Sequence, residues 1–125
     1  MIRLYNSFYT KMVIKIEVFY KQAKLYVFPS IYEGFGIPIL EAFHYQLTVA
    51  VANNTCLHEI GGEGVTCFDP FDLEHAKTIL LKLLEDDTLR EKQIRVGNQL
   101  SHSFSWDKSA NEIGKIAAEV VHLQA

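Results

Sequence analysis

The stretch that decides the fold is residues 33–41, EGFGIPILE. It holds two glutamates eight positions apart, a Gly-Phe-Gly turn between them, and a proline where a helix would begin. The residues before it, LYVFPS at 25–30, predict a buried strand that ends in a turn. A strand, a glycine-rich turn and a helix are the arrangement by which α/β proteins present backbone N–H groups to an anionic ligand. The two glutamates add acceptors for hydroxyl groups.

The bulk composition indicates one globular domain. The chain has 125 residues, of which 49% are hydrophobic, so it is long enough to bury a core and too short for two comfortable domains. The net charge of −3 and the scattered lysines and arginines argue against a nucleic-acid partner. There is no signal peptide and no run of about 18 apolar residues. The sequence therefore predicts a soluble, cytoplasmic protein without a transmembrane segment. Cys67, on a predicted strand, is expected to be a buried free thiol.

Predicted strands and helices alternate along most of the chain. The strands are predicted at 25–28, 48–52 and 65–68, and the helices at 17–24, 38–45, 56–60 and in three segments after residue 72. This alternation is typical of parallel βαβ units with right-handed crossovers. Residues 1–16 show no clear period, although 12–16 could form a short strand. The predicted fold class is α/β, a partial doubly wound, Rossmann-like parallel sheet with flanking helices, in which 25–28 is buried on both faces.

In the last three predicted helices, N-cap residues indicate where each helix begins and apolar residues at helical spacing indicate which face is buried. Asp72 is expected to cap the first of these helices, and Asp87 or Thr88 the second. Ser105 is expected to cap the last helix, and Trp106 to anchor it by packing. The stripe of the first helix is expected to lie in the core, and it comprises Leu73, Ala76, Leu80, Leu83 and Leu84.

Several separated blocks carry a family resemblance. They are Phe28-Pro29-Ser30, Tyr32-Glu33-Gly34-Phe35-Gly36, Pro38, Leu40-Glu41-Ala42, Glu59, Gly61-Gly62-Glu63-Gly64, Phe68-Asp69-Pro70 and Phe104-Ser105-Trp106. Together they resemble the retaining glycosyltransferases of the GT-B fold with an E-x7-E signature (family 4, or group 1). The resemblance covers about residues 17–121 and implies the C-terminal half of the donor-binding domain. The expected division is a segment of uncertain structure at 1–16 and a donor-domain fragment at 17–125.

The resemblance also implies an activity and a set of site residues. It implies transfer of a hexose from a nucleoside diphosphate sugar to an acceptor with retention, without a cofactor or a metal. Glu33 would be the catalytic residue that faces the sugar, and Glu41 would hold the ribose hydroxyls. The donor would also be bound by backbone N–H groups of Gly34, Phe35, Gly36 and Ile37.

The chain departs from the family pattern, and the departures leave an alternative open. No glycine precedes Gly34, so the upstream Gly-Arg loop that grips the diphosphate is missing, as is an acceptor domain. Residues 45–48 replace a Cys-Gly-Thr-Pro-type turn, and His58 replaces a proline. We therefore expect a C-terminal fragment that lacks turnover on its own. The alternative is a non-catalytic interaction or oligomerisation module, which would form a homodimer or bind a separately encoded N-terminal half.

Overall fold

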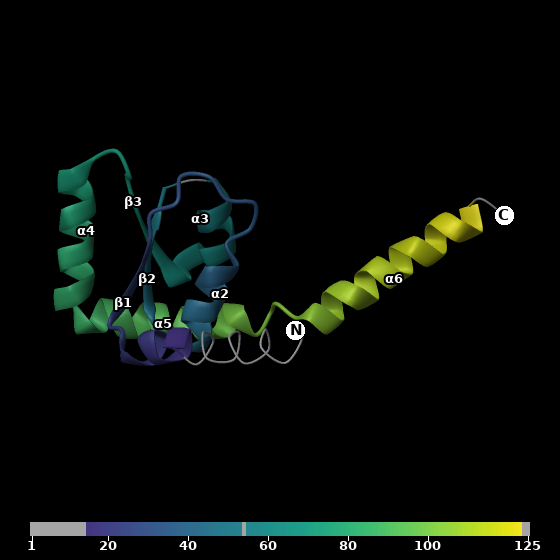
Figure 1. Cartoon of the computed structure of the whole chain (residues 1–125), viewed down its shortest axis with the longest axis horizontal. Helices are drawn as coiled ribbons and strands as arrows, with labels where there is room; N and C mark the ends of the chain where they lie inside the picture. The colour runs from purple at the N-terminus through teal and green to yellow at the C-terminus, as the bar shows by residue number, and fades with distance from the viewer. Residues whose placement is uncertain (1–14, 54, 124–125) are drawn as a thin grey trace, which may run out of the picture.

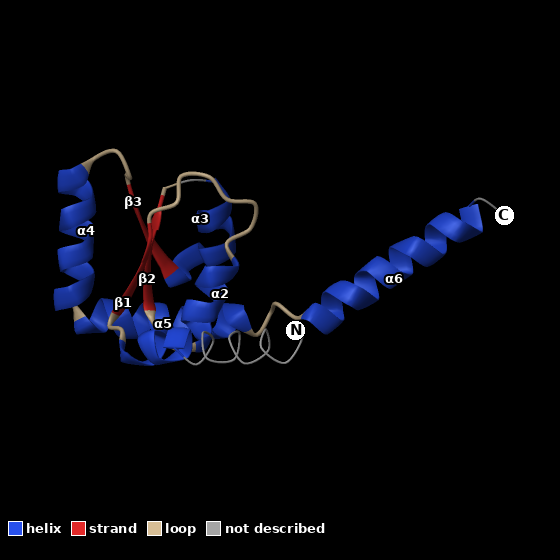
Figure 2. Ribbon diagram, in the orientation of Figure 1, coloured by secondary structure: helices blue, strands red, loops and turns tan. Residues whose placement is uncertain are grey.

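A computed structural model describes residues 15–53 and 55–123. Its centre is a three-stranded parallel sheet of β1 (Leu25–Phe28), β2 (Thr48–Ala52) and β3 (Val65–Phe68), in the order β1-β2-β3. Leu25 is paired with Thr48, and Val49 with Val65. Helices flank the sheet (Figure 2). The predicted α/β class and all three predicted strands are confirmed.

Burial differs between the middle strand and the edge strand. Every residue of β2 is buried, because it has a strand on each side and helices above and below. β1 is only partly buried, and Val27 is 38% exposed. Among the described residues β1 has a neighbouring strand on one side only. The prediction that residues 25–28 are buried on both faces is therefore wrong.

One face of the sheet is covered by α2 (Ile37–His44) and α3 (Thr55–Gly61), which continues into the short helix η1 (Gly62–Gly64). Residues 15–22 are also helical, close to the predicted helix at 17–24. The predicted strand at 12–16 is wrong for residues 15 and 16, and its other residues lie outside the described part. The buried cluster on this face comprises Ile39, Ala42, Phe43, Leu47, Val49, Val51, Leu57 and Val65.

The other face packs against α4 (Leu73–Glu85) and the first part of α5 (Asp87–Ser101), and the rest of α5 packs against α2 and η1. Here Leu83 is buried against Ala50 and Phe68. Leu73 is 80% exposed, because it begins α4 beyond the edge of the cluster, so the predicted core stripe is only partly right.

The two helix caps test the sequence prediction directly. The Asp72 carboxylate accepts a hydrogen bond from the backbone N–H of His75, 2.9 Å away, so its predicted role as the cap of α4 is confirmed. α5 is capped by Asp86, whose carboxylate accepts from Leu89 N at 2.9 Å. The predicted cap at Asp87 or Thr88 is wrong, because the helix begins one residue earlier than the pattern indicated.

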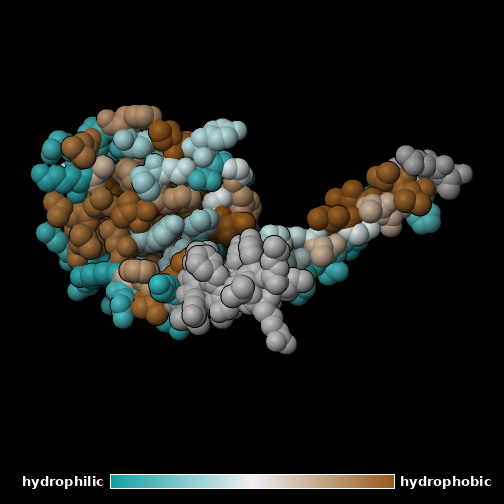
Figure 3. Space-filling model, in the orientation of Figure 1, coloured by the Kyte–Doolittle hydropathy of each residue, from teal (hydrophilic) through white to brown (hydrophobic). Residues whose placement is uncertain are grey.

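The last helix, α6 (Trp106–Leu123), projects away from the sheet and its covering helices (Figure 1). Ser105 caps it as predicted, because its hydroxyl accepts from Lys108 N at 3.4 Å. Trp106 is 82% exposed, so its predicted role as a packing anchor is wrong. Apolar side chains form a visible patch on α6 (Figure 3), and they include Ile113, Ile116, Val120 and Val121.

Two further expectations concern the membrane and the cysteines. No helix in the described part of the chain is long and apolar enough to cross a membrane. Cys67 is a free thiol that is half-buried, and burial raises its pKa. The expected thiol is therefore confirmed as free, but it is less enclosed than predicted.

Candidate functional site

The turn before α2 depends on one glycine. Gly36 is the residue before the helix, and its φ of 98° lies in the left-handed region that favours glycine. Its carbonyl accepts a hydrogen bond from Ile39 N at 2.9 Å. Pro38 lies in the first turn, as predicted, where its missing N–H costs nothing. Together these residues turn the chain sharply from the loop into α2.

The first glutamate of the motif is held within that loop. Ser30 Oγ donates a hydrogen bond to Glu33 Oε1 at 2.7 Å. Cys56 Sγ, on α3, donates to the backbone carbonyl of Glu33 at 3.0 Å. The side chain and the main chain of Glu33 are therefore both fixed, one by the loop and the other by a helix 23 residues away in sequence. Glu33 is partly buried, and a carboxylate oxygen can accept more than one hydrogen bond.

The second glutamate lies on α2 itself. Glu41 begins the second turn of the helix and its side chain is exposed. Its Oε2 accepts a hydrogen bond of 3.0 Å from the Tyr20 hydroxyl. The helix places this carboxylate beside the α2 N-terminus, where it can reach a polar ligand that lies along the helix.

The N-terminus of α2 is suited to a negatively charged group. No side chain caps it, whereas aspartates cap α4 and α5. The aligned peptide dipoles place partial positive charge at this end, and a nearby anion is stabilised by about 0.3–1 kcal/mol at an exposed site. A glycine-rich turn, an uncapped helix and two carboxylates can together bind a ligand that has both an anionic part and hydroxyl groups.

The structure brings three of the six predicted site residues to one cavity. Phe35, Ile37 and Glu41 line a hollow of about 1410 Å³ between the 15–22 helix, α2 and the start of α6. Phe35 packs edge-on against Phe104, with ring centroids 5.7 Å apart. The remaining three residues, Glu33, Gly34 and Gly36, lie in the adjoining loop and do not line this hollow.

Two residues of the site were not predicted from the sequence. Ser30 lies three positions before Glu33, and a serine at that distance in a loop is a recognisable partner for a carboxylate. Tyr20 gives no such local signal, because 21 residues separate it from Glu41. Only the packing of the two helices brings its hydroxyl to the carboxylate.

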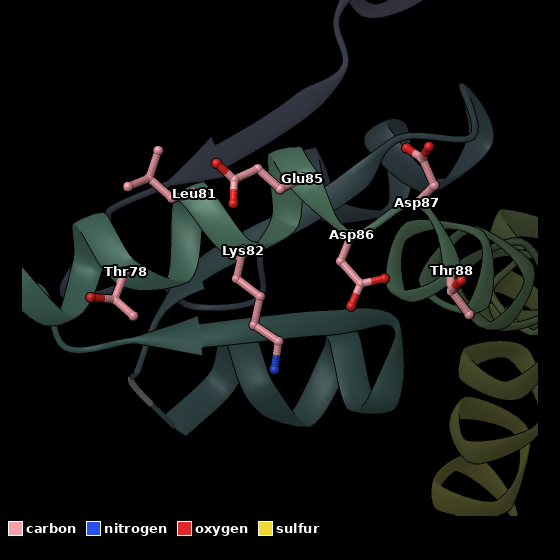
Figure 4. Close-up of a pocket in the computed structure, with 7 residues that line it drawn as sticks. All are labelled: Thr78, Leu81, Lys82, Glu85, Asp86, Asp87 and Thr88. Atoms are coloured by element: carbon pink, nitrogen blue, oxygen red, sulfur yellow. The ribbon is translucent and has the colours of Figure 1, made fainter.

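A second hollow lies at the corner between α4 and α5, away from the motif (Figure 4). Two of its acidic residues have structural roles, since Asp86 caps α5 and Asp87 pairs with Arg90. In residues 15–53 and 55–123, no group of three or more His, Cys, Asp or Glu side chains could hold a metal ion.

Comparison with known proteins identifies the family. The family model of the glycosyl transferases group 1 matches residues 6–100. This chain belongs to that family. The match spans the predicted strands and the whole E-x7-E stretch, so the family expected from the sequence blocks is confirmed. The alternative of a non-catalytic interaction module gains no support from it.

Individual relatives agree with the family match. The O-antigen chain mannosyltransferase B of Escherichia coli is 37% identical over 93 residues, which are 74% of this chain and 24% of that protein. The C-terminal domain of a glycosyl transferase group 1 family protein from Francisella tularensis is 27% identical, with a TM-score of 0.61 over 70% of this chain and 46% of that one. A sucrose-phosphate synthase from Thermosynechococcus elongatus is 22% identical and has a TM-score of 0.76 over 85% of this chain and 27% of that one.

These similarities show which part of a GT-B glycosyltransferase the chain corresponds to. It has the fold of the C-terminal half of a GT-B donor domain, as the resemblance implied. It spans about a quarter of the length of the E. coli relative. The roles of Glu33, Glu41 and the residues between them remain predictions.

Proposed function

We propose that this chain forms one wall of a nucleotide-sugar site in a retaining hexosyltransferase. The observation that carries the proposal is the uncapped N-terminus of α2, which lies between Glu33 and Glu41 in a member of the group 1 family. The donor's diphosphate would lie at the helix N-terminus, and its two polyols would lie on either side. The hexose is proposed to be mannose, because the E. coli relative is named a mannosyltransferase.

Each proposed role follows from the position of the residue. Glu33, which is held by Ser30, would accept hydrogen bonds from hydroxyl groups of the transferred sugar. Glu41, one turn into the helix, would accept hydrogen bonds from the hydroxyl groups of the ribose. Hydrogen bonds to a charged group contribute about 1.5–3 kcal/mol. The backbone N–H groups of Gly34, Phe35, Gly36 and Ile37 would face the sugar and the diphosphate.

The proposed mechanism requires little covalent chemistry from these residues. The bond between the sugar's anomeric carbon and the diphosphate breaks, and the leaving diphosphate is stabilised by the α2 dipole and by cations outside this chain. The acceptor hydroxyl forms its bond to that carbon from the same face of the sugar and gives its proton to the leaving diphosphate. This course retains the configuration of the sugar. Because the chain spans a quarter of its E. coli relative, we propose that turnover needs further parts of a longer enzyme, supplied in the same chain or by a partner. We also propose that the protein acts in the cytoplasm.

Ligand-observed NMR titration with ADP-glucose, UDP-glucose and GDP-mannose tests the proposal. We expect one of the three to bind with a millimolar dissociation constant or better. Glu41→Ala should weaken that binding by about tenfold or more, which corresponds to the lower end of the range for a charged hydrogen bond. The matched control is Glu85→Ala, which removes an exposed glutamate at the remote α4–α5 hollow and should leave binding unchanged.

The contrary result is equally definite. If none of the three sugars binds at millimolar concentration, and the upstream donor-domain half of the E. coli relative added in trans restores no binding, the proposed function is wrong.

A further inference from the structure

A tyrosine outside the E-x7-E motif holds the second motif glutamate. The Tyr20 hydroxyl lies 3.0 Å from Glu41 Oε2 and donates a hydrogen bond to it. The contact joins the 15–22 helix to α2, and both side chains line the same hollow. It is therefore a tertiary contact at the proposed ligand site.

The ring of Tyr20 is held on two sides, which fixes where its hydroxyl points. It stacks on Tyr45, with centroids 5.2 Å apart and an interplanar angle of 11°. It also packs against Tyr26 at 5.6 Å. Tyr45 follows Glu41 by one helical turn, so the ring rests on α2 directly beside the carboxylate. Burial and the bond to Glu41 raise the pKa of Tyr20, so the hydroxyl remains a donor at neutral pH.

Glu41 has reason to need such support. Its side chain is exposed, and glutamate is among the side chains that lose most rotamer freedom when they are fixed. A carboxylate that is already fixed before the ligand arrives spares the ligand that cost. Each carboxylate oxygen accepts two hydrogen bonds. The Tyr20 bond therefore leaves Oε1 and one position on Oε2 for a vicinal diol.

We propose that Tyr20 is a positioning residue that orients Glu41 to receive the two ribose hydroxyls of the donor. This inference rests on the proposed function, because it assumes that Glu41 binds the ribose. The inference adds Tyr20, which lies on a different helix from Glu41, to the proposed donor site. It also predicts that the affinity for the ribose depends on the Tyr20 hydroxyl. Tyr20→Phe isolates that hydroxyl, because phenylalanine keeps the ring that stacks on Tyr45.

The first arm of the test needs no ligand. In protein with ¹³C-labelled glutamate, the side-chain carboxyl resonance of Glu41 should move in Tyr20→Phe relative to wild type at pH 7. The matched control is Tyr32→Phe, since Tyr32 is 92% exposed; it should leave the resonance in place. An unmoved Glu41 resonance in Tyr20→Phe overturns the inference.

The second arm measures what the hydroxyl does for the ribose. The probes are ADP, GDP and UDP, followed by the 2′,3′-dideoxy form of whichever binds best. We expect Tyr20→Phe to weaken binding of the ribonucleotide about three- to tenfold and to leave the dideoxy form unchanged. In a Glu41→Ala background, Tyr20→Phe should have no further effect on either probe.

The outcomes separate the two proposals. If Tyr20→Phe weakens binding of both probes equally, the Tyr20 hydroxyl does not act through the ribose hydroxyls, and the inference is overturned while the proposed function stands. If Glu41→Ala binds the ribonucleotide as wild type does, the ribose role of Glu41 is wrong, and Tyr20 cannot act through it. If no nucleotide binds the wild-type chain, either alone or with the upstream donor-domain half of the E. coli relative added in trans, the proposed function and the ribose role of Tyr20 both fail.

Discussion

Gly36 lies directly against Leu57, so that a Cβ atom at position 36 would be only 2.8 Å from Leu57 Cδ2. The contact joins the turn of the E-x7-E motif to the buried face of α3, which sets how closely the loop approaches the sheet. The position also has a φ of 98°. The geometry of the proposed donor site therefore depends on a residue without a side chain at this point.

Gly36→Ala should destabilise the protein. The left-handed conformation costs a non-glycine residue about 1–2 kcal/mol, and overpacking adds about 1–3 kcal/mol. We expect the free energy of unfolding in urea to fall by about 2–5 kcal/mol. The matched control is Gly34→Ala, because a Cβ there meets nothing within 4 Å, and it should change stability by less than about 1 kcal/mol. If Gly36→Ala and Gly34→Ala lowered the free energy of unfolding equally, the proposed strain at position 36 would be contradicted.

Gly97→Ala should also destabilise, although it lies inside a helix where alanine is the better residue. A Cβ at Gly97 would lie 2.4 Å from Cδ1 of Phe43, which is fully buried. We expect a net loss of up to about 2 kcal/mol, since overpacking costs about 1–3 kcal/mol and the gain in helix propensity is only about 1 kcal/mol. Gly114→Ala on α6 is the control, because nothing lies near its Cβ. Gly114→Ala should raise the helix content measured by circular dichroism without lowering the free energy of unfolding. If it lowers the free energy of unfolding as much as Gly97→Ala does, the close contact between Gly97 and Phe43 does not explain the effect.

Trp106 is the single tryptophan of the chain and reports on α6. Because it is 82% exposed, its fluorescence should have the emission maximum of a water-exposed indole and should barely shift when urea unfolds the protein. A blue-shifted emission in the native state would show that the start of α6 packs against the body or against another chain.

Alkaline pH should destabilise the protein. Burial raises the pKa of Cys67 and Tyr26, and burial together with the Glu41 bond raises that of Tyr20. In the unfolded chain these groups lose protons near 9.0 for the thiol and 10.0 for the phenols, whereas the folded protein keeps them. The unfolded state then binds fewer protons, so the free energy of unfolding falls as pH rises.

This contribution is fully present below about pH 9 and is lost as pH rises through the folded pKa values. Urea unfolding at about pH 8 and about pH 10.5 measures the decline, and Cys67→Ala should reduce it. Stability that stays constant over this interval would argue against buried, protonated groups.

The sequence predicted the parts of the fold that depend on local pattern. Short apolar runs placed β1, β2 and β3 within a residue of their observed bounds, and the glycine and proline between them placed the start of α2. The cap of α5 was missed by one residue, because consecutive aspartates at 86 and 87 offer two equivalent caps. The errors at Leu73 and Trp106 have a different cause: periodicity shows which residues share a helix face but not what covers that face.

In the candidate site too, the sequence predicted the residues that are close together along the chain but not the contacts that depend on tertiary packing. The motif residues lie in one loop and the start of one helix, so spacing alone places them in the same region, although only Phe35, Ile37 and Glu41 line the hollow. The bond from Tyr20 to Glu41 depends on how two helices pack, and no local pattern encodes it. The bond from Ser30 to Glu33 was not predicted, but it joins residues only three positions apart and so could have been found from the sequence.

The measurement that tests the central claim most directly is a crossed titration of two variants with GDP-mannose and GDP. If Glu33 faces the sugar and Glu41 the ribose, Glu33→Ala should weaken binding of GDP-mannose about tenfold and leave GDP unchanged, whereas Glu41→Ala should weaken both ligands alike. The assignment of one carboxylate to each end of the donor is contradicted if Glu33→Ala weakens GDP as much as GDP-mannose. It is also contradicted if neither Glu33→Ala nor Glu41→Ala affects the binding of either ligand.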